Sequence, residues 1–435
     1  MILEQDARLS TSRLWPLMRR WFEARGLAAW SRREVPHWGT CNAFVAAAYA
    51  RVIEGFLRDR AARGQLERVD VVELGAGSGR LGLATVVELA ELRAASPTPL
   101  PPARYVLTDV AERTLAAWRS HPRLAPHLAS GALDLARLDL EAPAASLRLE
   151  VSGERLDGAS GLVAVANYVF DSLPQDLVRR GGDGRLEEGR VTLRAPDDDG
   201  LDLDDPVLLE LVQVELAWTP VGTDPDAELA ALAELEASRA GPAGGFFPVG
   251  GLRCLRRLLT FTDDLLLLAT DRVARPSDSP LDGLARHGSV SLPVSVEALA
   301  DLVRRRGGAT VTRDPGAGPL WSAALFSRPA EHPEAARAFR AALDPFGPGE
   351  ALALKRLVEE HADALSPEQL VAAVRLTRFD PAVLALCAGP LAAQPLDRAE
   401  LRRAVAAARA RYLPLGDVDE LEGALAPLLP LLRDG

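Results

Sequence analysis

Three glycines at alternate positions, between a short apolar strand and a helix, form the clearest chemical signal in this chain. The segment from Glu73 to Leu81 reads Glu-Leu-Gly-Ala-Gly-Ser-Gly-Arg-Leu, with glycine at 75, 77 and 79. Glycine permits a sharp turn and lets a ligand approach the backbone where no Cβ stands in the way. The spacing differs from the Gly-x-Gly-x-x-Gly that cradles a pyrophosphate in NAD enzymes. We therefore expect a nucleoside against bare backbone, with a ligand-free structural turn as the alternative.

This segment resembles the first motif of the class I S-adenosylmethionine (SAM)-dependent methyltransferases, with Glu73, Gly75, Gly77 and Gly79 at the matching positions. The resemblance implies that the loop, including Ala76, passes under the methionine and ribose of the cofactor. It also implies that Glu73 organises the polar side of that pocket. The fold that it implies is Rossmann-like α/β, with a mostly parallel seven-stranded sheet.

An acidic residue should then end the second strand, where a carboxylate can accept hydrogen bonds from both ribose hydroxyls. The segment 105–109 ends in Asp109, and we predict that Asp109 and its neighbour Val110 bind the cofactor. Thr108 and Glu112 compete for this role. A purely structural alternative is that Asp109 caps the helix that follows.

The third strand, expected near 133–140, ends in Asp139 and Leu140. Members of this family often contact the adenine at this place, so we predict that both residues bind the cofactor. Asp134 and Glu141 fit nearly as well.

Polar residues also leave the expected fourth strand, in the run Asn167-Tyr-Val-Phe-Asp-Ser-Leu-Pro174. Ligands of open α/β sheets lie beyond the carboxyl ends of the strands, so this run should face the methyl group. Methyl transfer needs an oriented acceptor and, for an amine or hydroxyl, a group that takes the proton. We predict that Asn167 and Asp171 supply these functions and that Tyr168 forms a wall of the acceptor site. The alternative is that Asn167 and Asp171 only cap and brace the loop.

The same run resembles the Asn-Glu-x-x-Asp-Ala-Leu-Pro motif of the MidA-like methyltransferases, a family that includes assembly factors methylating an arginine of mitochondrial complex I. Asn167, Asp171, Leu173 and Pro174 match, whereas Tyr168 replaces an acidic residue. An acidic clamp favours a guanidinium acceptor, so this replacement puts arginine-directed chemistry in doubt.

Other chemistries find little support in the sequence. His287, beside Gly288 in an expected strand, is a candidate acid, base or substrate contact, with a hydrogen-bonded loop residue as the alternative. The chain has no phosphate-binding Gly-Lys-Ser/Thr loop, no His-Glu-x-x-His zinc helix and no nucleophile elbow. We expect no metal site.

The elements that must position these residues alternate between strand and helix, which predicts a parallel sheet covered on both faces. Residues 181–245 interrupt the alternation with turn-rich, acidic sequence around hairpin-like strands at 185–194 and 207–218. The expected core strands are 69–74, 104–109, 133–140, 161–167, 265–269 and 321–326. The expected helices are one that follows the glycine turn and runs to about Ala94, and those at 111–119, 248–259 and 295–306.

Three domains follow from this pattern. Residues 1–66 form a helical region with Thr40 and Asn42 as helix caps, and 67–328 form the SAM-binding domain, with 181–245 as an acidic β-hairpin insertion. Residues 329–435 form a helical domain, with helix starts near 366, 380, 397 and 417. We interpret it as a bundle or, through its repeat-like spacing, as an arm that binds a protein partner.

Composition limits the partners and the compartment. The 435 residues include 50 basic and 61 acidic ones, a net charge of −11 that disfavours nucleic acid and anionic lipid as partners. Cys41, Cys254 and Cys387 lie far apart, which favours a reducing, cytoplasmic location. We find neither a secretory signal nor an apolar run of the ~20 residues that a membrane helix needs.

The sequence thus predicts a cytoplasmic SAM-dependent methyltransferase that acts on a protein side chain or a small molecule. The alternative is a non-catalytic methyltransferase-fold scaffold that binds a partner protein through its helical tail.

Overall fold

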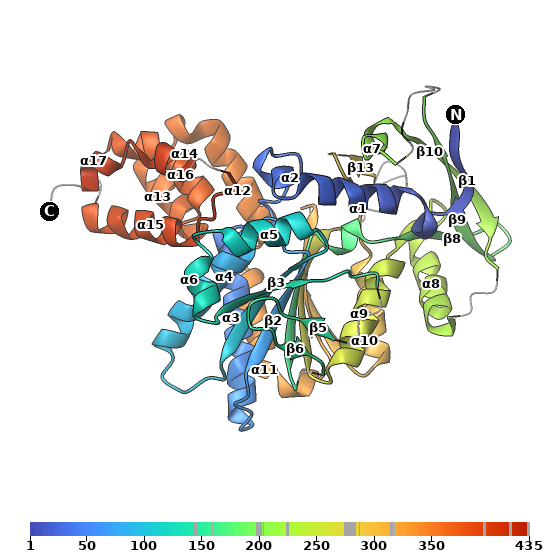
Figure 1. Cartoon of the computed structure of the whole chain (residues 1–435), viewed down its shortest axis with the longest axis horizontal. Coiled ribbons are helices and arrows are strands. Elements are labelled where there is room, and N and C mark those ends of the chain that lie inside the picture. Colours follow the sequence, from blue (N-terminus) through green and yellow to red (C-terminus); the bar gives the residue numbers. More distant parts are fainter. Residues whose placement is uncertain are drawn as a thin grey trace.

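A seven-stranded sheet forms the centre of the structure, and its strands are the Val-, Leu- and Ala-rich runs of the sequence (Figure 1). Five neighbouring strands are parallel, whereas β16 runs antiparallel to β12 and β15. Across the sheet the order is β15 (Ala309–Arg313), β16 (Leu320–Phe326), β12 (Leu265–Arg272), β7 (Leu162–Asn167), β2 (Val69–Leu74), β3 (Ala103–Asp109) and β4 (Leu133–Arg137).

The topology of this sheet is that of a Rossmann-like protein. Numbered along the chain, the strands from β4 to β15 follow the order 3-2-1-4-5-7-6, and the first five of these follow the doubly wound order. The predicted Rossmann-like α/β fold, with a mostly parallel seven-stranded sheet, N-terminal helices and C-terminal helices, is confirmed. Strand β15 was missed, because Ala309–Arg313 is polar and half-buried at the edge of the sheet.

The computed structural model describes most of the chain. The described residues are 1–142, 146–158, 160–196, 202, 204–222, 226–273, 284–286, 288–313, 316, 318–394, 397–416 and 420–432.

Successive residues of a strand point to opposite faces, so the sheet builds two hydrophobic cores. Val71 of β2 faces one core, whereas Val72 faces the other. The helices of the first core are α3 (Ala43–Ala62), α4 (Arg80–Ala95), α5 (Glu112–Ser120) and α11 (Pro333–Leu343), and those of the second are α8 (Ala227–Ala240), α9 (Val249–Phe261) and α10 (Val296–Arg305). In Figure 1, α3 and α9 lie on opposite sides of the strands. Within the described ranges, none of the helices combines the length and apolarity required to cross a bilayer.

A smaller, antiparallel sheet contains the insertion and the start of the chain. It comprises β1 (Ile2–Arg8), β8 (Asp176–Arg180), β9 (Leu186–Arg194), β10 (Gln213–Pro220) and β11 (Gly245–Phe247). The expected hairpin is present, since β9 pairs with β10, although α7 (Leu208–Leu211) replaces the start of its second strand. The helical prediction for 1–66 was wrong at Ile2–Arg8, because β1 pairs with a strand far along the chain and no local periodicity reveals such a partner. Two further pairs are β5 (Leu147–Arg148) with β6 (Arg155–Leu156) and β13 (Ala285–Arg286) with β14 (Val290–Ser291).

The N-terminal helices α1 (Leu14–Arg25) and α2 (Ala28–Ser31) run from the small sheet towards the C-terminal helices (Figure 1). The next helix, α3, begins where predicted, because the Asn42 side chain accepts the Val45 N–H at 2.9 Å.

The C-terminal helices have a hydrophobic core of their own. The predicted caps at Ser366, Asp380 and Asp397 are confirmed, since each side chain accepts backbone N–H groups of the helix it precedes. Residues 417–419 of the fourth predicted start lie outside the described residues. The helices are α12 (Pro348–His361), α13 (Pro367–Leu376), α14 (Pro381–Ala392), α15 (Arg398–Arg411), α16 (Glu420–Leu425) and α17 (Leu429–Leu432).

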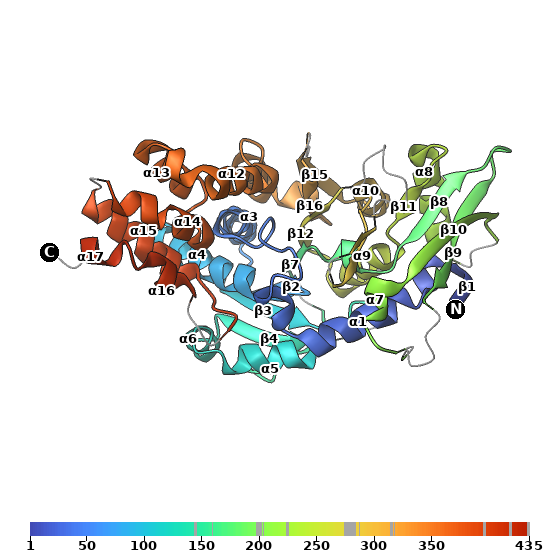
Figure 2. The ribbon, with the colours of Figure 1, turned by 90° about the horizontal axis from the view of Figure 1, so that it is seen from above.

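Polar contacts fix these helices to the sheet domain. The Arg411 guanidinium donates to the Glu88 carboxylate of α4 at 2.7 Å, and both side chains are buried. The Trp38 indole N–H donates to Asp380, the cap of α14, at 3.1 Å. Figure 2 shows the C-terminal helices beside α3 and α4. The C-terminal helices therefore pack against the helices of the first core of the central sheet.

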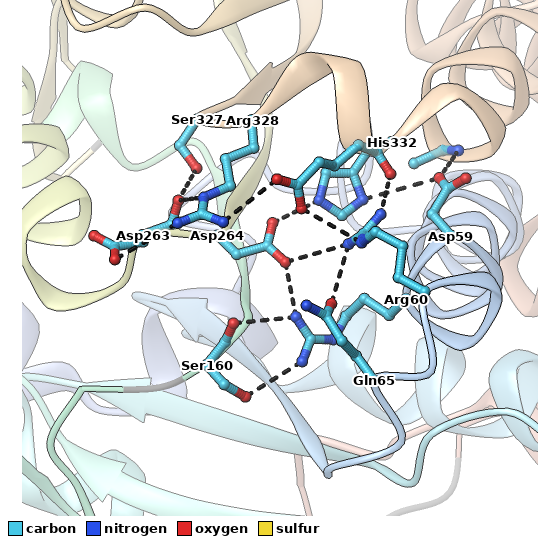
Figure 3. Close-up of polar contacts among 12 residues, drawn as sticks. Asp59, Arg60, Gln65, Ser160, Asp263, Asp264, Ser327, Arg328 and His332 are labelled. Atoms are coloured by element: carbon cyan, nitrogen blue, oxygen red, sulfur yellow. Dashed lines mark hydrogen bonds and ion pairs between the residues drawn. The ribbon is translucent and has the colours of Figure 1, made fainter.

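A buried ion-pair network fastens the start of α11 to the amino ends of β7 and β12 (Figure 3). Arg60, whose side chain is fully buried, donates to Asp264 at 2.7 Å and to the Ser160 carbonyl at 3.1 Å. His332, which precedes α11, lies 2.5 Å from the other Asp264 oxygen. Burial opposes ionisation of Asp264, but His332 and Arg60 outweigh it and hold the pKa of this carboxyl below its usual value.

The same network contains a group that could be mistaken for a metal site. Asp264, Glu331 and His332 offer ligand atoms within 4.8 Å of one another. Because Arg60 already supplies positive charge to Asp264, we assign this group to ion pairing.

We expect Arg60→Met to lower the free energy of unfolding by about 3–5 kcal/mol, because it removes the fully buried cation that lies 2.7 Å from the buried Asp264 carboxylate. Arg337→Met, which removes an exposed ion pair to Glu334, should cost less than about 1 kcal/mol. Urea unfolding of both variants tests this. A midpoint of Arg60→Met equal to that of Arg337→Met would show that the buried network contributes no stability.

Candidate functional site

A cavity of about 1130 Å³ lies at the carboxyl ends of the central strands. Its walls come from the N-terminal helices, the turn after β2, the loop after β7 and the C-terminal helices. Gly79 is not part of the described lining, and His287 lies outside the described residues. The predicted site residues that line the cavity are Glu73, Gly75, Ala76, Gly77, Asp109, Val110, Asp139, Leu140, Asn167, Tyr168 and Asp171.

The glycine turn after β2 has the left-handed backbone that its sequence requires. The φ angles of Gly75, Gly77 and Gly79 are +57°, +53° and +72°, a region that other residues rarely adopt. Gly75 is exposed to the cavity, where a Cβ would meet only Val169, at 3.5 Å. A Cβ at Gly79 would instead lie 2.9 Å from the Trp118 indole nitrogen. The bare backbone at 79 thus accommodates protein packing, and that at 75 faces open space.

The side chain of Trp30 covers Gly77. A Cβ at position 77 would lie 2.5 Å from the Trp30 indole, and this ring stacks on Phe22 of α1 with centroids 6.0 Å apart. Sequence reasoning missed Trp30, because a tryptophan in a short helix gives no signal of a contact with a distant turn. Bare backbone therefore reaches the cavity at Gly75, beside the tryptophan.

The Glu73 carboxyl is buried at the end of β2. Its Oε2 accepts the Tyr105 hydroxyl at 2.9 Å. Burial raises the pKa of Glu73 to about 8, although the hydrogen bond from Tyr105 opposes this shift. Glu73 is therefore mostly protonated at neutral pH and can donate as well as accept a hydrogen bond.

Asp109 ties the end of β3 to the glycine turn. Its carboxylate accepts the Gly77 N–H at 3.2 Å and the Ala111 N–H at 2.9 Å. Burial raises the pKa of Asp109 to about 6, against the effect of these backbone hydrogen bonds. Asp109 is not the N-cap of α5, which is Ala111, so its carboxylate braces the turn before the helix, and it also lines the cavity.

The predicted adenine contact at Asp139 already has a protein partner. Arg19 of α1 donates to Asp139 at 2.7 Å and also pairs with Glu141. The Leu140 carbonyl accepts Arg257 at 2.6 Å. Arg19 was not identified from the sequence, since an arginine on a half-exposed helix is common.

Asn167 is engaged by protein groups on every side. Its Oδ1 accepts the Tyr49 hydroxyl at 2.8 Å and the Thr270 N–H at 3.1 Å, and its Nδ2 donates to the Thr40 carbonyl at 2.9 Å. This geometry corresponds to the bracing alternative, because the side chain holds the end of β7 against α3 and β12.

Asp171 lies in a short turn after β7, close to a second buried carboxyl, Asp271 at the end of β12. The Ser172 hydroxyl donates to Asp171 at 2.9 Å, and Asp271 accepts the N–H groups of Phe170 and Asp171. Burial raises the pKa of Asp171 to about 6, and burial together with the Asp171 charge raises that of Asp271 further. The negative charge of Asp171 therefore disfavours ionisation of Asp271. Asp271 was missed because its partner follows another strand.

Tyr168 adopts a strained backbone between these residues. Its φ is +52°, which is uncommon for a residue other than glycine and concentrates at functional sites. Tyr168 lines the cavity, and its role as a wall of an acceptor site stays a prediction.

Comparisons with known proteins add distant likenesses. No family model matches the chain, and no curated protein matches it. Two solved structures from Burkholderia thailandensis are similar, each with 17% sequence identity and a TM-score of 0.45. One is described as an uncharacterized protein, and the match covers 74% of this chain and 88% of that one. The other is described as a candidate methyltransferase bound to S-adenosyl-homocysteine, with 80% and 86% covered.

The raised pKa of Glu73 predicts a pH-dependent stability. The pKa of Glu73 in the folded state, about 8, exceeds its ordinary value of 4.5, so the folded state binds this proton more tightly than the unfolded state does. The resulting contribution to the free energy of unfolding is complete below pH 4.5 and is lost as the pH rises to about 8. Glu73→Gln should therefore gain stability relative to wild type by about 1.4 kcal/mol per pH unit across this window. Urea unfolding near pH 5.5 and near pH 7.5 measures it. The solvated Glu210→Gln should show no such gain, and a pH-independent difference for Glu73→Gln would contradict the assignment.

Proposed function

We propose that this protein is a SAM-dependent methyltransferase. The observation that carries the proposal is the large cavity where the glycine turn after β2, the Asp109 carboxylate after β3 and the Asn167–Asp171 run after β7 converge. This is the place where open α/β sheets bind nucleotide-like ligands.

The residues at this place fit the cofactor. Gly75 exposes backbone to the cavity without a Cβ, which suits a close approach of the methionine and ribose portions. A carboxylate offers about four lone-pair positions, and Asp109 uses part of them on Gly77 and Ala111, so it retains capacity for ribose hydroxyls. Glu73, protonated at neutral pH, contributes a polar group deeper in the same wall. When bound, SAM supplies an electrophilic methyl group on a sulfonium.

The loop after β7 acts on the acceptor. Asp171 takes the proton that an amine or hydroxyl acceptor releases on methylation, and its burial raises its pKa to about 6, which suits a base working near neutrality. Tyr168 orients the acceptor, and Asn167 keeps the loop in position. We keep both a protein side chain and a small molecule as acceptors at this step.

The alternative is that the protein is a non-catalytic scaffold that binds a partner protein. A protein partner bound through residues 329–435 stays a prediction, and α12 and α14 contribute cavity walls, which an enzyme uses and a pure docking arm does not need.

Gly75→Leu should abolish binding of S-adenosyl-homocysteine, because its side chain would enter the cavity at the bare backbone. The control is Gly131→Leu, which replaces a glycine with a similar positive φ, +72°, and open surroundings and therefore has comparable backbone strain. Titration calorimetry should show wild-type affinity for the control. Equal affinities for both variants would place the cofactor elsewhere.

Asp171→Asn should reduce methyl transfer by about 10²–10⁴-fold and leave the affinity for S-adenosyl-homocysteine unchanged. The assay incubates the enzyme with labelled SAM and host lysate and follows label in proteins and small molecules. Because the pKa of Asp171 is about 6, wild-type transfer should rise with pH through that value.

The matched control for this assay is Asp205→Asn, which changes an exposed turn residue. A chain that binds the cofactor, transfers no label and captures a protein through its C-terminal helices would instead support the scaffold.

A further inference from the structure

The part of the cavity wall formed by α12 carries an excess of positive charge. Lys355 and Arg356 line the cavity from α12, and Arg33 lines it from the loop after α2. Glu359 is the acidic residue among them, and Lys355 donates to it at 2.9 Å while lying 5.7 Å from the Trp38 ring centroid. Three cations thus surround one carboxylate, which leaves two positive charges uncompensated.

The uncompensated charges belong to Arg33 and Arg356. Within the described part of the chain, neither guanidinium has a hydrogen-bond or ion-pair partner, in contrast to Arg19, which pairs with Asp139 in the same cavity. Both are exposed, in a chain whose net charge is −11. Arginine binds carboxylate and phosphate in a bidentate manner, so an unpaired couple at a cavity suits an anionic ligand.

Arg356 adjoins the acceptor side of the cavity, where its charge acts on the Tyr168 hydroxyl. A Cβ built at Gly39 would lie 3.2 Å from the Tyr168 hydroxyl, 3.2 Å from Leu320 and 3.7 Å from Leu352 of α12, so these three side chains meet at one point. Arg356 follows Leu352 by four residues and therefore lies on the same face of the helix. On α12, Arg356 thus follows, by one helical turn, the residue that meets the wall formed by Tyr168.

Apolar side chains also line the cavity, which leaves room for a second molecule. Leu320, Leu352 and Leu386 line the cavity, and its volume of about 1130 Å³ exceeds the roughly 300–1,000 Å³ of a typical single-ligand site. A small acceptor with an apolar body therefore fits beside a cofactor.

We propose that the methyl acceptor is a small molecule with an apolar body and an anionic group, a carboxylate or a phosphate, that Arg33 and Arg356 bind. The proposal rests on the proposed function and names the substrate class of that site. The anion is anchored beside α12, and another atom of the acceptor reaches Asp171. A protein arginine would meet like charge here, so the substrate class differs from that implied by the MidA-like resemblance.

The test is titration calorimetry with three probes that share one apolar chain: decanoate, decyl phosphate and decan-1-ol, each below its micelle concentration and with S-adenosyl-homocysteine present. Wild type should bind both anions at least about tenfold more tightly than the alcohol, since charge-assisted hydrogen bonds contribute this much. In the double variant Arg33→Glu, Arg356→Glu, the affinity for both anions should fall by about the same factor, whereas the affinity for the alcohol should change little.

The matched control is Arg148→Glu, Arg253→Glu, which makes the same change in net charge at exposed positions outside the cavity lining and should bind the anions like wild type. Equal wild-type affinity for decanoate and decan-1-ol, or an equal loss in the control, would overturn the anion site. Titration of S-adenosyl-homocysteine alone separates the two proposals. If the double variant binds S-adenosyl-homocysteine as tightly as wild type does, its defect is confined to the acceptor site. If wild type does not bind S-adenosyl-homocysteine, the proposed function itself is overturned.

Discussion

The turn after β2 must hold three residues in left-handed backbone, and the arrangement of the site depends on this constraint. Each glycine faces a different part of the molecule: Gly75 faces the cavity, Gly77 packs under Trp30 of the N-terminal helices, and Gly79 packs near Leu413 of the C-terminal tail. A side chain at any of the three would strain the backbone, and at the last two it would also displace a packed neighbour. The turn is therefore the point where the beginning, the centre and the end of the chain meet.

Charge is distributed unevenly around the cavity, and this unevenness gives its two ends different chemistry. On the glycine-turn side, the buried carboxyls Glu73 and Asp109 have raised pKa values and internal partners. On the other side, Arg356 of α12 and Arg33 of the loop after α2 remain exposed and uncompensated. A protein with net charge −11 thus presents a local positive surface to an incoming ligand, which favours the approach of an anion.

Much of the fold was predictable because its elements are locally encoded. The apolar run at Val69–Leu74, the glycines after it and the Asn42 cap of α3 each carry their own signal, and all are present as expected. The features that were missed depend on contacts between distant segments. Strand β1 needs β9 as its partner, Trp30 needs Gly77, and neither pair is visible in a local window.

The candidate site shows the same division between local and distant information. Sequence position predicted that Asn167 and Asp171 would follow β7, but not that Asn167 would be engaged by Tyr49 and Thr270. The paired carboxyl Asp271 comes from another strand. The C-terminal helices were expected as a separate domain, and only the three-dimensional structure reveals that they line the cavity.

The most direct test of the account is a crystal structure of the chain grown with S-adenosyl-homocysteine. The account predicts electron density for the nucleoside against the Gly75 backbone, with the ribose hydroxyls at the Asp109 carboxylate. Electron density for the nucleoside at another place in the chain, with the Trp30 ring filling the space over the glycine turn, would contradict this prediction.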